Sequence, residues 1–166
     1  KLSKKQDVAT SSSESDVTNK SGVNFFDVNI LLDDFSLKNL YNKSEELTPK
    51  TFKNKFTVIN FFASWCSTCR AEHDVLLELQ RRNLVDVYGI AWHDIEENTK
   101  YYLEKYGNPF TKTFVDSKGD LGRIIGIKAI PETLIVNEDG VAVMRFQGNL
   151  QEFSIDEIAD FLKENN

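Results

Sequence analysis

The stretch from Phe56 to Leu79 constrains the fold of this chain more than any other. It opens with a largely apolar run, residues 56–63, whose length and composition are those of a buried β-strand. Cys66 and Cys69 follow the run directly, at the spacing C-x-x-C. After them, apolar residues recur at helical spacing: Ala71, Val75, Leu76 and Leu79. The sequence therefore predicts a strand, a tight turn that carries two cysteines, and a helix.

A C-x-x-C pair between a strand and a helix is typical of thiol–disulfide redox sites. Cys66 would lie at the helix N-terminus, where free N–H groups and the helix dipole favour the thiolate. The thiolate is the attacking species in disulfide exchange. Cys69 would follow one turn later, close enough to attack a mixed disulfide. We therefore expect Cys66 to be an exposed nucleophile and Cys69 a more sheltered resolving thiol.

Two other uses of the cysteine pair are a structural disulfide and half of a zinc site. Zinc would need further ligands, and His73 and His93 are the only histidines. The strand and the tryptophan before Cys66 favour the redox interpretation. We expect no metal and no organic cofactor, and we expect both histidines to lie on the surface.

Composition limits the remaining possibilities. The chain has 166 residues, 40% of them hydrophobic, which suits one domain with a sizeable core. Its net charge of −6 argues against a nucleic-acid partner. No run of about 20 apolar residues is present, so no segment of this sequence is expected to span a membrane.

The first 22 residues differ in composition from the rest. They are rich in Ser, Lys, Asp and Thr and poor in large apolar side chains, so they cannot bury enough surface to offset their ordering entropy. We expect residues 1–22 to be a disordered linker and residues 23–166 to form the domain. A plain terminal tail is the alternative interpretation.

Strand and helix patterns alternate along the domain. The expected elements are a half-exposed strand at 34–40, a short helix that Thr48 and Pro49 begin, a buried strand at 84–92, an amphipathic helix at 95–106, a strand from 114, a short helix at 121–127, a hairpin of 133–137 with 141–146, and a last helix with a capping box of Ser154 and Glu157. This order predicts an α/β fold whose mixed sheet is parallel first and antiparallel last.

Four short motifs resemble one known group of proteins. They are Trp65–His73 (WCSTCRAEH), Gly107–Phe110 (GNPF), Ile130–Thr133 (IPET) and Gly148–Leu150 (GNL). The first resembles the thioredoxin superfamily. Together, over residues 34–164, the motifs are similar to the periplasmic thiol:disulfide reductases of cytochrome c maturation (CcmG/DsbE type, TlpA-like).

The resemblance implies a fold and a function. It implies a thioredoxin-like fold with helices on both sides of the sheet, an N-terminal extension and a central strand–helix insertion, here 84–106. It implies a reductant that passes electrons to apocytochrome c or a haem-attachment partner and is re-reduced by a membrane electron donor of the DsbD/CcdA type. The expected location is the periplasm, with a tether to the inner membrane outside this sequence, and the expected state is a monomer.

The resemblance also implies roles for residues outside the cysteine pair. The Ile130–Pro131 bond would be cis and lie against the cysteines. The groove wall would be Trp65, and the residues between the cysteines, Ser67 and Thr68, would tune the reduction potential. Glu72 and Glu132 would give the site a negative face that disfavours the thiolate, or else be ordinary surface carboxylates.

Three positions depart from the expected pattern. Asn60 stands where thioredoxins carry a buried Asp that handles protons; Asn cannot act as a base, so Glu72 would take over. Ser67 replaces a usual proline, and Lys128 lies near a usual aromatic residue, which weakens the substrate assignment. Other periplasmic thioredoxin-like reductases or oxidases, such as cytochrome oxidase assembly proteins, and a redox-silent binding module with the same groove therefore remain alternatives.

Overall fold

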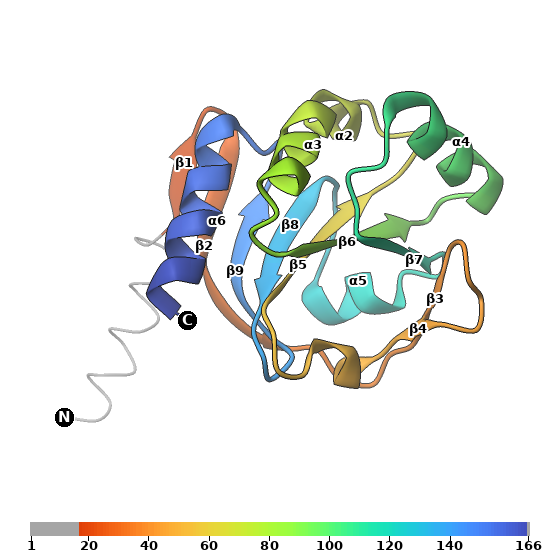
Figure 1. Ribbon diagram of the computed structural model, residues 1–166, viewed down its shortest axis with the longest axis horizontal. Coiled ribbons are helices and arrows are strands. Elements are labelled where there is room, and N and C mark those ends of the chain that lie inside the picture. The colour runs from red at the N-terminus through yellow and green to blue at the C-terminus, as the bar shows by residue number, and fades with distance from the viewer. Residues whose placement is uncertain (1–16, 166) are drawn as a thin grey trace.

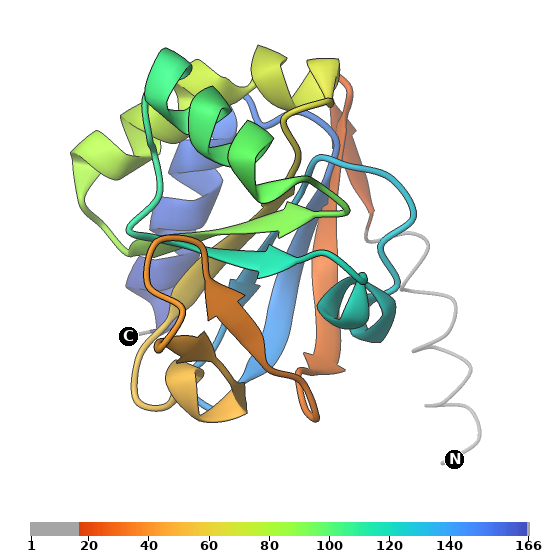
Figure 2. The ribbon, with the colours of Figure 1, turned by 90° about the vertical axis from the view of Figure 1, so that its right-hand side faces the viewer.

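The computed structural model describes residues 17–165, in which a twisted nine-stranded sheet carries helices on both faces (Figures 1 and 2). The strand order is β1-β2-β9-β8-β5-β6-β7-β3-β4. The strands are β1 (Thr18–Lys20), β2 (Val23–Leu31), β3 (Leu37–Asn39), β4 (Glu46–Leu47), β5 (Thr57–Phe62), β6 (Asp86–Trp92), β7 (Lys112–Asp116), β8 (Glu132–Val136) and β9 (Val141–Gln147). The helices are η1 (Pro49–Phe52), α2 (Ser67–Ala71), α3 (His73–Arg82), α4 (Glu96–Tyr106), α5 (Asp120–Ile125) and α6 (Glu152–Asn165).

The apolar strand before the cysteines, β5, lies in the middle of the sheet. It pairs in parallel with β6, which pairs in parallel with β7. On its other side β5 pairs antiparallel with β8, and β8 pairs antiparallel with β9. The mixed sheet predicted from the order of elements is therefore confirmed.

Side chains of β5 alternate between two hydrophobic cores because successive residues of a strand face opposite sides. Val58 and Phe62 pack in the core that α3, α4 and α6 cover. Ile59 and Phe61 pack in the second core, beneath α5 and η1. All six β5 residues are buried, which explains the unbroken apolar pattern of this strand.

The N-terminal boundary of the domain lies earlier than the sequence suggested. Residues 18–20 form β1, which pairs antiparallel with β2, so the linker expected over 1–22 is wrong at its C-terminal end. Residues 1–16 lie outside the described part of the chain. Strand β2 pairs antiparallel with β9, and the hairpin of β1 and β2 is the N-terminal extension of the sheet.

Several helix and strand limits also differ. Residues 84–106, the predicted strand–helix insertion, contain β6 and α4, and β6 is an interior strand of the sheet. The predicted Ser154–Glu157 capping box is wrong, because α6 begins at Glu152. Ser154 lies in the first turn, where its Oγ accepts the Gln151 N–H at 2.9 Å.

The turn between β1 and β2 packs against the loop that follows β9. Gly148 has φ +106°, and a Cβ built on it would lie 2.7 Å from the carbonyl oxygen of Gly22. The Gly148 N–H donates to the carbonyl of Pro131 at 3.1 Å. These contacts fix the N-terminal hairpin next to the loop that leads into β8.

We predict that Gly148→Ala destabilises the protein by more than about 2 kcal/mol, because a positive φ and a backbone clash act together. Gly126→Ala is the matched control, since Gly126 has φ +85° but a Cβ added to it would meet nothing within 4 Å. That control should cost only about 1 kcal/mol. Denaturant midpoints measure the stability of both variants. Equal losses of stability would show that the clash with Gly22 contributes nothing.

Candidate functional site: a disulfide beside a cis-proline loop

Cys66 and Cys69 form a disulfide at the start of α2. Cys66 is the N-cap residue, and the Cys69 N–H points at its Sγ at 3.1 Å. Cys66 is 6% exposed and Cys69 2%, so the expected order of exposure holds, but the oxidised Cys66 is not an exposed side chain.

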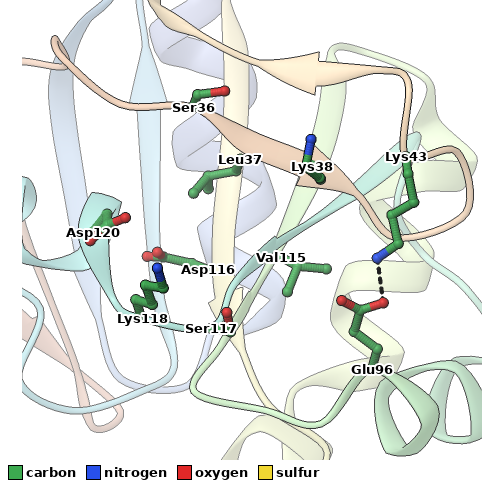
Figure 3. Close-up of a pocket in the computed structure, with 10 residues that line it drawn as sticks. All are labelled: Ser36, Leu37, Lys38, Lys43, Glu96, Val115, Asp116, Ser117, Lys118 and Asp120. Carbon is green, nitrogen blue, oxygen red and sulfur yellow. Dashed lines mark hydrogen bonds and ion pairs between the residues drawn. The ribbon is translucent and has the colours of Figure 1, made fainter.

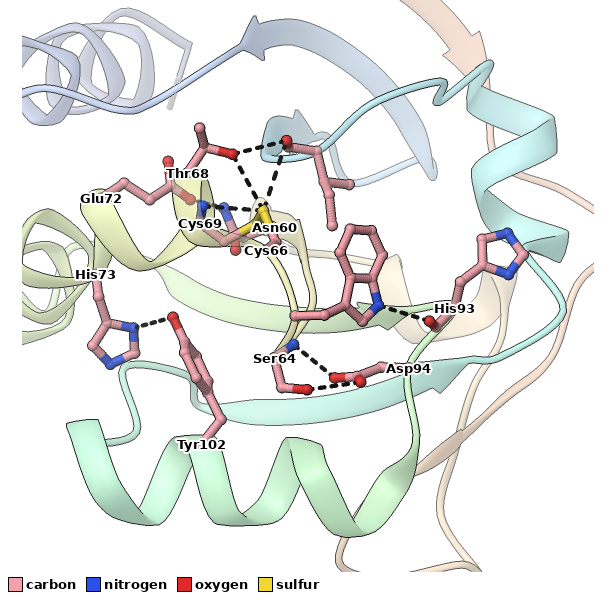
Figure 4. The surroundings of a disulfide bond; sticks show 12 residues. Asn60, Ser64, Cys66, Thr68, Cys69, Glu72, His73, His93, Asp94 and Tyr102 are labelled. Carbon is pink, nitrogen blue, oxygen red and sulfur yellow. Dashed lines mark hydrogen bonds between the residues drawn. A yellow bond between two sulfur atoms is a disulfide. The ribbon is translucent and has the colours of Figure 1, made fainter.

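The Ile130–Pro131 peptide bond is cis, as the resemblance implied. The carbonyl oxygen of Ile130 lies 3.8 Å from Cys66 Sγ and accepts a hydrogen bond from Thr68 Oγ1 at 3.4 Å. Thr68 Oγ1 is itself 3.3 Å from Cys66 Sγ. The loop before β8 therefore lies directly against the sulfur that we expect to be the nucleophile (Figure 4).

Hollows on the two sides of this loop together form what we call the groove. Trp65, 58% exposed, forms a wall of it, and the Trp65 indole N–H donates to the carbonyl of His93 at 2.9 Å. The groove is lined by Ser21, Gly22, Trp65, Cys66, Ser67, Thr68, Trp92, Gly126, Lys128, Ala129, Ile130, Pro131, Glu132, Gln147, Gly148, Asn149 and Gln151. The structure thus brings the predicted Trp65, Ser67, Thr68, Ile130 and Pro131 together.

Glu72 is buried beside the disulfide and is not a surface carboxylate. It is 1% exposed and lies at the break between α2 and α3. One carboxylate oxygen accepts the Leu150 N–H at 2.9 Å, and the other accepts from Asn60 Nδ2 at 2.9 Å. Burial raises the pKa of Glu72 to about 7, although both hydrogen bonds oppose that rise. This acid can therefore exchange a proton near neutral pH.

Asn60 lies on β5, close to this acid and to the cysteines, as Figure 4 shows. Its Nδ2 also bonds Thr133 Oγ1 on β8, at 2.9 Å. Its Oδ1 is buried and has no hydrogen-bond partner among the described residues. Rotation of the amide would present this oxygen to Glu72, so Asn60 can accept a hydrogen bond from the protonated acid and donate one to the carboxylate.

Glu132 lines the groove behind Ile130 and Pro131, but its carboxylate does not face the cysteines. It is buried on the opposite face of β8 from Thr133, where its carboxylate binds Arg145 at 2.6 and 3.2 Å. The expected pair of acids on one negative face is therefore wrong. The alternation of a β-strand separates them, because neighbouring residues 132 and 133 point to opposite sides. An arginine within the apolar pattern of 141–146 was the signal for this buried partner.

His73 is buried, contrary to expectation, whereas His93 is exposed. The Nε2 atom of His73 lies 2.7 Å from the carbonyl oxygen of Gly107, and its Nδ1 lies 3.5 Å from the hydroxyl of Tyr102. Since a carbonyl accepts, Nε2 carries the proton. His73 thus joins the start of α3 to the end of α4, which links two of the motifs noted in the sequence.

A separate pocket lies between β3, β7 and the start of α5 (Figure 3). Three of its charged groups already have partners: Lys43 forms an ion pair with Glu96, and buried Asp116 accepts the Gly122 N–H at 2.9 Å. Burial raises the pKa of Asp116, and its backbone bonds show that it caps α5. This pocket contains neither cysteine, so the groove beside Cys66 is the candidate site.

Comparison with known proteins places this site in context. The family model "Redoxin" matches residues 27–162. The thiol:disulfide interchange protein DsbE of Allochromatium vinosum is 33% identical over 108 residues, which are 65% of this chain and 60% of that protein. The thiol:disulfide interchange protein CycY of Rhizobium leguminosarum bv. viciae is 34% identical over 111 residues, 67% of this chain and 60% of that protein.

Solved structures share the fold. A putative thioredoxin from Neisseria meningitidis superposes with a TM-score of 0.70 at 21% identity, over 84% of this chain and 93% of that one. The fold is therefore thioredoxin-like. The chain spans about 60% of the length of the two curated relatives. Because the family model covers most of the sequence, including both cysteines and the cis-proline, this chain belongs to the Redoxin family.

Proposed function

We propose that this chain is a thiol–disulfide oxidoreductase that reduces a disulfide in apocytochrome c or in a protein of the haem-attachment machinery. The oxidoreductase activity is supported by one observation: a disulfide at a helix start lies against a cis-proline loop and next to a buried acid whose pKa is near neutral. Two relatives named thiol:disulfide interchange proteins support it. The cytochrome substrate is supported by the motif resemblance.

The first step uses the reduced pair. The Cys66 thiolate attacks one sulfur of the substrate disulfide, a mixed disulfide forms, and the other substrate sulfur leaves as a thiolate. In the oxidised structure the Cys66 sulfur occupies the place of that thiolate, and the Cys69 N–H directed at it at 3.1 Å would stabilise the negative charge. The Ile130 carbonyl, next to the same sulfur, limits the approach of the substrate to the groove side.

The second step needs a proton acceptor. Cys69 gives up its proton and attacks Cys66 Sγ; the Cys66–Cys69 disulfide forms, and the second substrate thiolate leaves and takes up a proton. Two electrons have then passed to the substrate. Glu72, one helical turn after Cys69 and with a pKa of about 7, suits the acceptor role. Asn60, bonded to Glu72, orients the carboxyl group.

Location and electron supply belong to the same proposal. We place the chain outside the cytoplasm, tethered to the inner membrane and re-reduced by a membrane donor of the DsbD/CcdA type, since the resembling reductases work there. Within residues 17–165, none of the helices is long and apolar enough to cross a bilayer.

The proposed function is tested by trapping the substrate. Cys69→Ala removes the attack that resolves the mixed disulfide, so partners should accumulate as covalent adducts that a reductant releases. Cys66→Ala is the matched control and should trap none through the groove. Adducts with apocytochrome c or haem-attachment proteins support the full proposal. Absence of any adduct would reject the redox activity, and adducts with other exported proteins would reject only the substrate.

Nucleophile assignment gives a second prediction. In the reduced protein Cys66 should be alkylated at least about tenfold faster than Cys69, because Cys66 lines the groove and Cys69 is buried within α2. Mass mapping of singly labelled protein measures the ratio. A label found mainly on Cys69 would reverse the two roles.

Glu72 gives a pH prediction. Its pKa is raised from 4.5 to about 7 on folding, so the folded state binds the proton more tightly, and the free energy of unfolding should fall as pH rises from about 5 to 8. The fall attributable to this group is about 3 kcal/mol. In Glu72→Gln that fall should disappear, because Gln cannot titrate and can still accept the Leu150 N–H. Denaturant unfolding of the two oxidised proteins at several pH values measures this difference. If the free energy of unfolding depends on pH in the same way in both, Glu72 does not titrate as predicted.

A further inference from the structure

The loop that carries both Lys128 and Pro131 is held in place from below. It runs from the end of α5 to the start of β8, residues 126–131. Arg145 donates to the carbonyl oxygens of Ile125 at 3.0 Å and Gly126 at 3.2 Å while it binds Glu132. The buried ion pair therefore fixes both ends of the loop. Its exposed side chains project from a backbone of defined position.

Lys128 is the one charged side chain of that loop, and it is exposed. It lines the groove both beside Cys66 and behind Ile130. Within residues 17–165, no carboxylate forms a salt bridge with its ammonium group. Glu132, the other charged side chain that lines the groove, is neutralised by Arg145. The groove therefore presents a single positive charge, on a chain whose net charge is −6.

We infer that Lys128 is a specificity-determining residue, which selects substrate segments with a carboxylate close to the cysteine that Cys66 attacks. This inference rests on the proposed thiol–disulfide exchange and names the class of segment that the groove takes. An extended segment that brings its cysteine to Cys66 must pass through the hollow that Lys128 lines. A Glu or Asp next to that cysteine would pair with the ammonium group, whereas a Lys or Arg would be repelled.

The size of the expected preference follows from the exposure of Lys128. Ion pairs between exposed groups contribute from near zero to about 1 kcal/mol, which is at most about a fivefold change in rate. Screening is also strong for such pairs, since the Debye length is about 10 Å at 0.1 M salt. The preference should thus be modest, present at low ionic strength and lost at high salt.

The experiment uses the reduced full chain and synthetic peptides that each contain one disulfide. In two peptide sets the residue before or after the attacked cysteine is Glu, Gln or Lys, and all other residues are identical. The quantity measured is the second-order rate constant with which each peptide disulfide oxidises the reduced chain in a single turnover, at low and high salt. We expect the order Glu, Gln, Lys in at least one set, with about threefold between neighbours.

Variants test whether the charge of Lys128 causes the preference for Glu-containing peptides. Lys128→Gln should abolish it and Lys128→Glu should reverse it. Lys53→Glu is the matched control, because Lys53 is exposed and precedes Asn54, which bonds Glu138 in the β8–β9 turn, at the other end of β8 from Pro131. The control makes the same change in net charge and should keep the original order.

The outcomes separate this inference from the proposed function. If the reduced protein fails to reduce every peptide, the exchange activity itself is rejected. If all peptides are reduced at equal rates, or if Lys128→Glu keeps the original order, the role of Lys128 is overturned. A small neutral disulfide completes the test: if Lys128→Gln changes its reduction as much as that of the peptides, Lys128 acts on the Cys66 thiolate and the inference falls.

Discussion

The buried carboxyl group of Glu72 holds the site together. Its two oxygens bond Asn60 on β5 and the N–H of Leu150 before α6, so one side chain joins three segments that are distant in sequence. A buried acid with only these partners is costly to ionise, and its pKa is raised for that reason. The same burial that fixes the end of α2 thus makes Glu72 a group able to exchange protons beside the cysteine pair.

Successive side chains of β8 point to opposite faces of the sheet, and this alternation separates the polar residues Thr133 and Glu132. Thr133 points toward Asn60 and Glu72, whereas Glu132 points away and binds Arg145. That ion pair lies beneath the loop of the cis-proline, and Arg145 also bonds the carbonyl of the loop's first residue, Gly126. One acid therefore acts below the disulfide, and the other supports the groove from the opposite face of the sheet.

Local patterns in the sequence predicted the strand, the cysteine turn and the parallel-then-antiparallel sheet, because each depends on neighbouring residues. The motif resemblance also placed the cis-proline correctly. Properties set by contacts across the fold were missed. The break at Glu72 interrupts an apolar spacing that one continuous helix would also show. The burial of His73 depends on Gly107, and the face of Glu132 depends on where β8 begins.

Under the proposed function, the groups for proton exchange lie apart from those for substrate recognition. Glu72 and Asn60 are buried beneath the disulfide and do not line the groove, while Trp65 and Lys128 line the groove and have no contact with Glu72. Because distant groups without shared partners contribute nearly independently, substitutions in the groove can alter which substrate is chosen while the proton chemistry below stays intact. A thioredoxin-like domain built in this way can change its partners without rebuilding its redox centre.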